Sequence, residues 1–109
     1  MQNVPQTDIN NTIQILKQQG NFLSLSRTQA SLFASPFSFS INHHTKVTVI
    51  AAGIISFEPE ALSDKDIVLS CGIHGNETAP IEICEQLVKN ILTSEIEVKQ
   101  NVLFLFGNL

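Results

Sequence analysis

The first third of the chain carries one helical pattern, followed by a segment without a clear period. Thr7 is a plausible N-cap for this helix, and Gly20 supplies a stop signal. The apolar positions of the helix are Ile9, Ile13, Ile15 and Leu16. The serine-rich segment 21–36 follows neither a helical nor a strand period. We therefore expect residues 1–36 to form a helix and an irregular or weakly extended lead-in.

Apolar side chains at every second position predict strands in the middle of the chain. In residues 37–41 large apolar side chains alternate with serines, and residues 47–51 show the same period of two. The polar residues 42–45 between them suit a turn. Gly53 is expected to break or bulge the second strand, with extended structure continuing to residue 57. Residues 37–57 are thus predicted to form a β-hairpin.

The second half of the chain has the pattern of a βαβ unit, residues 67–106. Residues 67–71 form a short continuous apolar run, which is typical of strands covered on both faces. Pro80 suits the first turn of a helix that ends near Leu92, and residues 102–106 form the next strand. The helix carries an apolar stripe at Cys84, Leu87, Val88 and Ile91.

These elements predict an α/β fold: a mixed sheet with flanking helices. The hairpin contributes antiparallel strands, whereas the strands of a βαβ unit are parallel. The loop 72–80 leaves the carboxyl end of the first parallel strand. Open α/β sheets bind ligands at this position.

Composition narrows the function classes. The chain has 109 residues, of which 43% are hydrophobic and 15% charged, so it is expected to bury a core. The net charge is −4 and the basic residues are scattered, which argues against a nucleic-acid partner. The longest near-apolar run, residues 47–57, is shorter than the roughly 20 residues of a membrane span, and no secretory signal is visible. We expect a cytoplasmic protein without a membrane partner.

Several other chemically active side chains have structural interpretations. Cys71 and Cys84 are expected to be reduced core thiols, although a structural zinc site that also includes His74 and Glu77 is conceivable. The adjacent residues His43 and His44 are expected in a solvated turn. Glu82 is expected to serve the dipole of its helix rather than act as a general base.

His74 and Glu77 are the strongest candidates for chemistry. Their spacing in a tight loop allows an imidazole and a carboxylate to converge, and both are suitable zinc ligands. Gly72 and Gly75 permit close approach of the backbone to a metal. On spacing alone, capping of the following helix is the favoured role for the pair, because this spacing of histidine and glutamate is common by chance.

The complete string Gly-Ile-His-Gly-Asn-Glu-Thr-Ala-Pro at residues 72–80 resembles the zinc motif of the succinylglutamate desuccinylase and aspartoacylase family, most closely its desuccinylase branch. The resemblance extends to the preceding strand, the following helix, and residues 105–108 of the next strand. The family often has Asn-Pro where this chain has Asn108-Leu109. The resemblance implies the N-terminal portion of a zinc-exopeptidase-like, or carboxypeptidase-like, domain. Because the chain ends just after a core strand, we expect its C-terminus to be cut.

By this resemblance His74 and Glu77 are two of three ligands of one Zn²⁺ per complete active site. The third ligand, the general base and the substrate-binding arginines are expected beyond Leu109. Asn76 and Thr78 are expected to support the ligands by hydrogen bonds, and Asn108 to line the substrate pocket. The implied reaction is hydrolysis of N-succinyl-L-glutamate to succinate and L-glutamate, in arginine catabolism. This chain alone is expected to be inactive.

Two alternatives remain open from the sequence. The chain is also compatible with a non-catalytic remnant that serves as a structural or partner-binding module. Equally, it is compatible with an aspartoacylase-like hydrolase of another N-acyl amino acid, because the residues expected to set specificity lie beyond Leu109.

Overall fold

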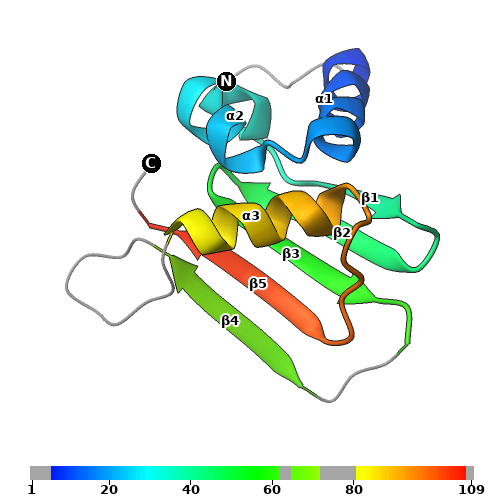
Figure 1. Ribbon diagram of the computed structural model, residues 1–109. Helices are drawn as coiled ribbons and strands as arrows, with labels where there is room; N and C mark the ends of the chain where they lie inside the picture. The colour runs from blue at the N-terminus through cyan, green and yellow to red at the C-terminus, as the bar shows by residue number, and fades with distance from the viewer. Residues whose placement is uncertain (1–5, 62–64, 72–80, 108–109) are drawn as a thin grey trace.

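One mixed five-stranded sheet forms the centre of the molecule, with its strands in the order β1-β2-β3-β5-β4. The computed structural model describes residues 6–61, 65–71 and 81–107. The helices are α1 (Gln6–Gln19), α2 (Phe22–Thr28), the 3-10 helix η1 (Ala30–Phe33) and α3 (Ile81–Leu92). The strands are β1 (Phe37–Ile41), β2 (Thr45–Ala51), β3 (Ile54–Pro59), β4 (Asp66–Cys71) and β5 (Asn101–Phe106). Helix α3 crosses one face of the sheet, and α1 and α2 lie beside it (Figure 1).

The strand directions confirm the predicted α/β fold with a mixed sheet. Strands β1, β2 and β3 pair antiparallel, and β3 pairs antiparallel with β5. Strands β4 and β5 pair parallel and are connected through α3, which is the predicted βαβ unit. The predicted hairpin is instead a three-stranded meander. Its register shifts between Val49 and Ala51, and Gly53, at a φ of 79°, lies in the turn that reverses the chain into β3.

The sheet buries the face that the helices cover. Phe104 of β5 and Phe57 of β3 are fully buried on this face, with their rings perpendicular and 5.9 Å apart. From α3, the predicted apolar stripe supplies Val88 and Ile91, both almost fully buried. Edge-to-face ring pairs of this kind stabilise beyond the area that they bury. Strands and helices therefore share one core.

The segment predicted to be irregular contains a short helix and a 3-10 turn. In α2, Phe22, Leu23 and Leu25 are buried. The hydroxyl oxygen of Ser26 accepts a hydrogen bond from the backbone N–H of Gly53, at 3.0 Å. The prediction for residues 21–36 was wrong because a helix of seven residues is too short to display a period, and tertiary packing supplies its stability.

Gly20 ends α1 at the point where that helix approaches α3. Its φ is 62°, and its N–H donates to the carbonyl oxygen of Leu16 at 2.8 Å, which closes the helix as the sequence predicts. A Cβ atom at this position would lie 2.7 Å from the carbonyl oxygen of Lys89. Only glycine therefore satisfies both the backbone conformation and the contact between the helices.

We expect the substitution Gly20→Ala to lower the free energy of unfolding by more than about 1 kcal/mol, because it adds left-handed backbone strain to a steric clash. Urea unfolding followed by circular dichroism measures the change. Gln19→Ala is the matched control, since Gln19 is exposed in the preceding position. Equal unfolding midpoints for the two variants would contradict the assigned contact.

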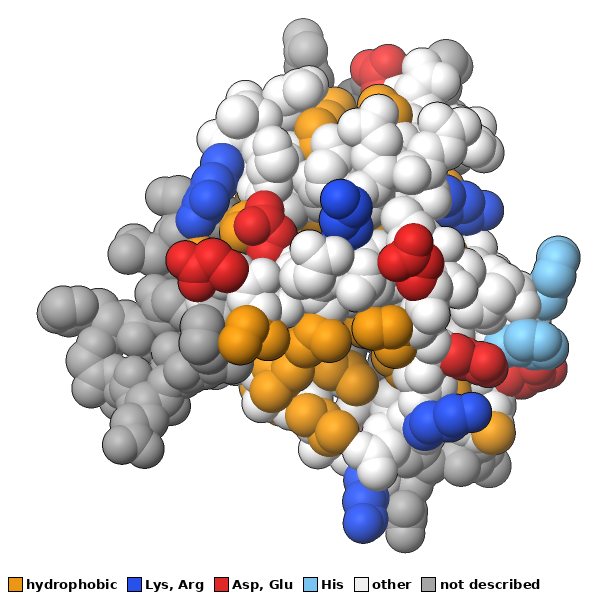
Figure 2. Space-filling view, viewed as in Figure 1, with side chains coloured by type: hydrophobic (Ala, Val, Ile, Leu, Met, Phe, Trp, Pro, Cys, Tyr) orange, Lys and Arg blue, Asp and Glu red, His pale blue; other side chains and the backbone are white. Residues whose placement is uncertain are grey.

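Strand β4 departs from the prediction that it is covered on both faces. Val68 is 57% exposed and Ile67 is 38% exposed, on opposite faces of this edge strand. Figure 2 shows apolar side chains gathered over β5 and β4, below α3. The described helices therefore cover the sheet over β1, β2 and β3 more completely than over β4. Separately, no helix in the described ranges is long and apolar enough to cross a membrane.

Candidate active site

The carboxyl ends of β4 and β5 lie side by side and frame the loop that the sequence singles out. Cys71 at the end of β4 pairs with Phe106 at the end of β5. The N–H of Gly107 donates to the carbonyl oxygen of Cys71 at 2.9 Å, which extends the pairing by one residue. Residues 72–80 connect this edge to Ile81, the first residue of α3. The loop therefore starts at the carboxyl end of a parallel strand, where α/β proteins bind ligands.

The predicted site residues themselves lie outside the described part of the chain. His74, Asn76, Glu77 and Thr78 fall within residues 72–80, and Asn108 falls after Gly107. Their assignments as zinc ligands, supporting residues and pocket residue stay predictions. The structure describes strand β4 and helix α3, which precede and follow this segment.

A disulfide bond joins Cys71, at the end of β4, to Cys84 in α3. Their Cα atoms are 6.5 Å apart, and both side chains are fully buried. The expectation of reduced thiols is wrong in this structure, whereas the expected packing of both side chains in the core is confirmed. The structural zinc site that would use both sulfurs is also contradicted, because disulfide sulfurs are not thiolate ligands.

The adjacent histidines lie at the opposite end of the sheet. The turn between β1 and β2 places Asn42 and His43 at positive φ. Thr45, the first residue of β2, pairs with Pro59, the last residue of β3, and this end of β3 lies beside the start of β5. His44 is 60% exposed, with its Nδ1 3.3 Å from Oε2 of Glu60. The predicted solvated turn is confirmed, and this turn is remote from the carboxyl ends of β4 and β5.

Because both partners are exposed, His44→Ala is expected to change the free energy of unfolding by no more than about 0.5 kcal/mol. Urea unfolding of the two chains in parallel checks this expectation. A loss above about 2 kcal/mol would mean that the histidine has a structural role that the exposed ion pair does not explain.

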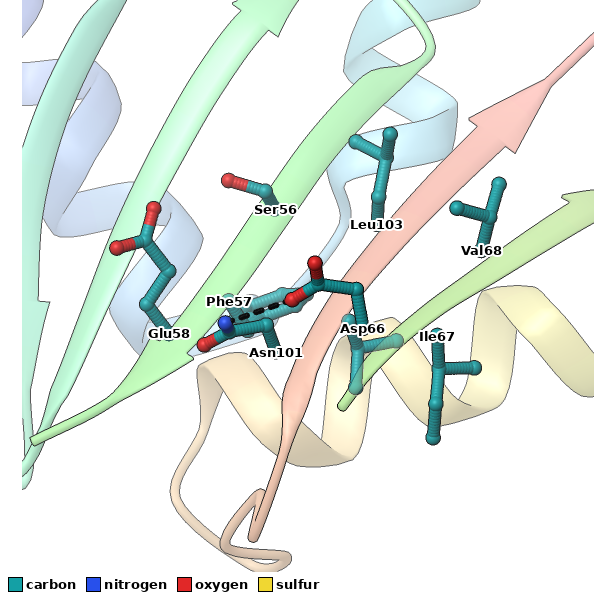
Figure 3. A pocket seen from close by; sticks show the side chains of 9 residues that line it. Ser56, Phe57, Glu58, Asp66, Ile67, Val68, Asn101 and Leu103 are labelled. Atoms are coloured by element: carbon teal, nitrogen blue, oxygen red, sulfur yellow. Dashed lines mark hydrogen bonds between the residues drawn. The ribbon is translucent and has the colours of Figure 1, made fainter. Parts of the chain in front are cut away.

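A shallow groove of about 300 Å³ lies on the other half of β4 and β5. Asp66, Val68, Asn101 and Leu103 line it, and Nδ2 of Asn101 donates to Oδ1 of Asp66 at 2.8 Å (Figure 3). Asp66 and Asn101 are the first residues of their strands. The groove is therefore at the amino ends of the parallel pair, away from the predicted zinc loop.

The remaining described side chains add no metal centre. In residues 6–61, 65–71 and 81–107 no three His, Cys, Asp or Glu side chains are grouped closely enough to hold a metal ion. Glu82 is exposed in the first turn of α3, as expected for a carboxylate that favours the positive end of a helix dipole.

The chain is similar to known proteins of one family. Residues 63–109 match the family described as the succinylglutamate desuccinylase/aspartoacylase catalytic domain. The chain is 60% identical over 94 residues to a succinylglutamate desuccinylase of Pseudoalteromonas atlantica, covering 86% of this chain and 27% of the relative. It is 49% identical over 96 residues to one of Shewanella woodyi, covering 88% and 28%.

A solved structure shows the same arrangement of elements. It is a succinylglutamate desuccinylase from Vibrio parahaemolyticus, with a TM-score of 0.67 and 28% sequence identity. The match covers 79% of this chain and 25% of the solved chain. The chain thus spans about a quarter of the length of the relatives that it matches.

Proposed function

We propose that the chain is the N-terminal part of a zinc-dependent hydrolase of the succinylglutamate desuccinylase/aspartoacylase family, because residues 63–109 match the catalytic domain of that family and most of the chain is similar to its desuccinylases. The proposed reaction splits N-succinyl-L-glutamate into succinate and L-glutamate, within cytoplasmic arginine catabolism. The observation that carries the proposal is the high identity to desuccinylases over most of this chain. The partner is then a small N-acyl amino acid, with no nucleic acid and no membrane involved.

The proposed zinc ligands in this chain are the imidazole of His74 and the carboxylate of Glu77. This donor set fits Zn²⁺, which accepts nitrogen and carboxylate oxygen, and a catalytic site uses three protein ligands and an open position. When bound, zinc supplies a Lewis acid that polarises a carbonyl group and makes a water molecule nucleophilic near neutral pH. The third ligand and the general base are proposed to come from outside residues 1–109.

We propose that strand β4 and helix α3, on either side of the segment, hold the two ligands in position. Strand β4 enters the loop beside β5, and α3 leaves it packed against the same sheet through Val88 and Ile91. The segment therefore starts directly after Cys71, which is fully buried, and leads into a helix whose apolar stripe is buried. A catalytic group must be held closely in place, and rigid elements provide that positioning better than loops alone.

A chimera tests the proposal. Residues 1–109 would replace the matching N-terminal segment of the desuccinylase of Pseudoalteromonas atlantica, and succinate release from N-succinyl-L-glutamate would be measured. We expect the chimera to be active with zinc, and the 109-residue chain alone to be inactive, since it supplies two of three ligands and no general base. The unmodified relative is the control.

Three outcomes would overturn the proposal. Normal succinate release by the chain alone would contradict the division of the active site. A folded but inactive chimera that binds no zinc would favour the non-catalytic module. A chimera that hydrolyses an N-acylated aspartate in preference to N-succinyl-L-glutamate would assign the aspartoacylase-like activity instead.

A further inference from the structure

Cys71 and Cys84 form a disulfide bond in addition to packing in the core. They are the two cysteines of the sequence, so no other thiol in the chain competes for either of them. One is the last residue of β4 and the other lies in the first turns of α3. Their Cα separation of 6.5 Å lies within the range that a disulfide requires. The bond therefore ties a strand end to a helix across residues 72–83.

The surroundings of the pair suit the reduced state as well. Both sulfurs are fully buried in the hydrophobic core, where a thiol packs as a small apolar group. The Sγ of Cys71 also lies 3.6 Å from the carbonyl oxygen of Leu69, which places an acceptor within reach of its S–H. Neither state leaves the sulfur of Cys71 without a partner.

Local opening gives reagents a route to the buried sulfurs. Strand β4 is the edge strand, paired on one side by β5, and Val68 in its centre is more than half exposed. Elements with few buried contacts open at a lower free energy than the central strands. Detachment of β4 exposes Cys71 without unfolding β1, β2 and β3.

From these observations we propose that Cys71 and Cys84 form a reversible, redox-sensitive disulfide that sets the stability of the β4–α3 unit. The oxidant is a low-molecular-weight disulfide. One cysteine thiolate attacks its S–S bond and releases one small thiol, and the second cysteine thiolate then displaces the other. Two protein thiols become one disulfide while one small disulfide becomes two thiols. This proposal uses described residues and stands independently of the zinc ligands.

The test uses the 109-residue chain and oxidised glutathione. The reduced chain is incubated with the oxidant under native conditions, and then alkylated after denaturation. We expect a monomer with no alkylated thiol, lighter than the reduced chain by two hydrogen atoms, and restored by reductant. Two alkylated thiols, a stable glutathione adduct, or linked dimers as the main product would overturn the proposal.

The second measurement tests whether the disulfide between Cys71 and Cys84 stabilises the fold. Urea unfolding of the oxidised and reduced wild-type chains is compared, so no variant has to fold. Closing a loop of this length is expected to lower the unfolding equilibrium constant roughly a hundredfold. The double variant Cys71→Ser/Cys84→Ser is the control. Its unfolding midpoint is expected to be the same with and without reductant. Equal midpoints for the two wild-type forms would overturn the proposed effect on stability.

Discussion

In the chimera, His74→Ala and Glu77→Ala are each expected to lower succinate release by more than about 100-fold. Removing a residue that hydrogen-bonds to a zinc ligand typically lowers metal affinity or activity 10–100-fold. Removing a ligand itself is expected to lower both by more. The zinc content should fall in the same variants, because two remaining protein ligands hold the metal weakly. Steady-state kinetics and metal analysis of the purified proteins measure both effects.

His44→Ala is the matched control for the ligand variants. It removes an imidazole that is exposed at the opposite end of the sheet, so activity and zinc content are expected to stay near those of the unmodified chimera. Full zinc content and activity in His74→Ala would contradict its assignment as a ligand. Equal losses in His74→Ala and His44→Ala would indicate a general effect on folding instead.

The largest loss of stability is expected from Phe104→Ala in the 109-residue chain. Phe104 is fully buried in β5, with its ring centroid 5.9 Å from that of Phe57 and 6.4 Å from that of Phe106. Its truncation removes buried area and leaves a cavity between two rings. The expected loss in the free energy of unfolding is about 3–5 kcal/mol. Urea unfolding of the wild-type and variant chains measures it.

Val68→Ala is the comparison for that variant. Val68 lies on the parallel strand next to β5 but is mostly exposed, so its truncation is expected to cost within about 0.5 kcal/mol. If Phe104→Ala loses no more stability than Val68→Ala, the packing of the core around β5 differs from that described. A disproportionate loss in Val68→Ala would mean that the open face is covered in solution.

The parts of the fold with a repeated pattern were predictable from the sequence. The alternation in residues 37–41 and the helical stripe that contains Val88 and Ile91 each repeat often enough to identify the element and its buried face. Gly20 marked the end of α1 because its positive φ is a property of the residue itself. In these places local preference and tertiary packing agree.

Other features depend on distances that no local pattern contains. The sequence shows that Cys71 and Cys84 are apolar in setting, but their bond depends on how the end of β4 meets α3. In α2, Ser26 pairs with Gly53, which lies 27 positions further along the chain. The exposure of Val68 likewise depends on which elements cover the sheet, and not on the apolar run itself.

For the candidate site, sequence and structure contribute different parts. The motif at residues 72–80 predicted the ligands His74 and Glu77, and the structure describes the strand and helix on either side of them. A short motif identifies donor types and their spacing. Its placement at the carboxyl end of β4 follows from the parallel pairing with β5, which the βαβ pattern predicted and the structure confirms.

A crystal structure of the zinc-loaded chimera, with anomalous diffraction at the zinc edge, tests the proposed ligand pair most directly. We predict one anomalous peak at the carboxyl end of β4, about 2.0–2.2 Å from an imidazole nitrogen of His74 and a carboxylate oxygen of Glu77. A zinc ion bound elsewhere, with both side chains turned away from it, would contradict the assignment of His74 and Glu77 as zinc ligands.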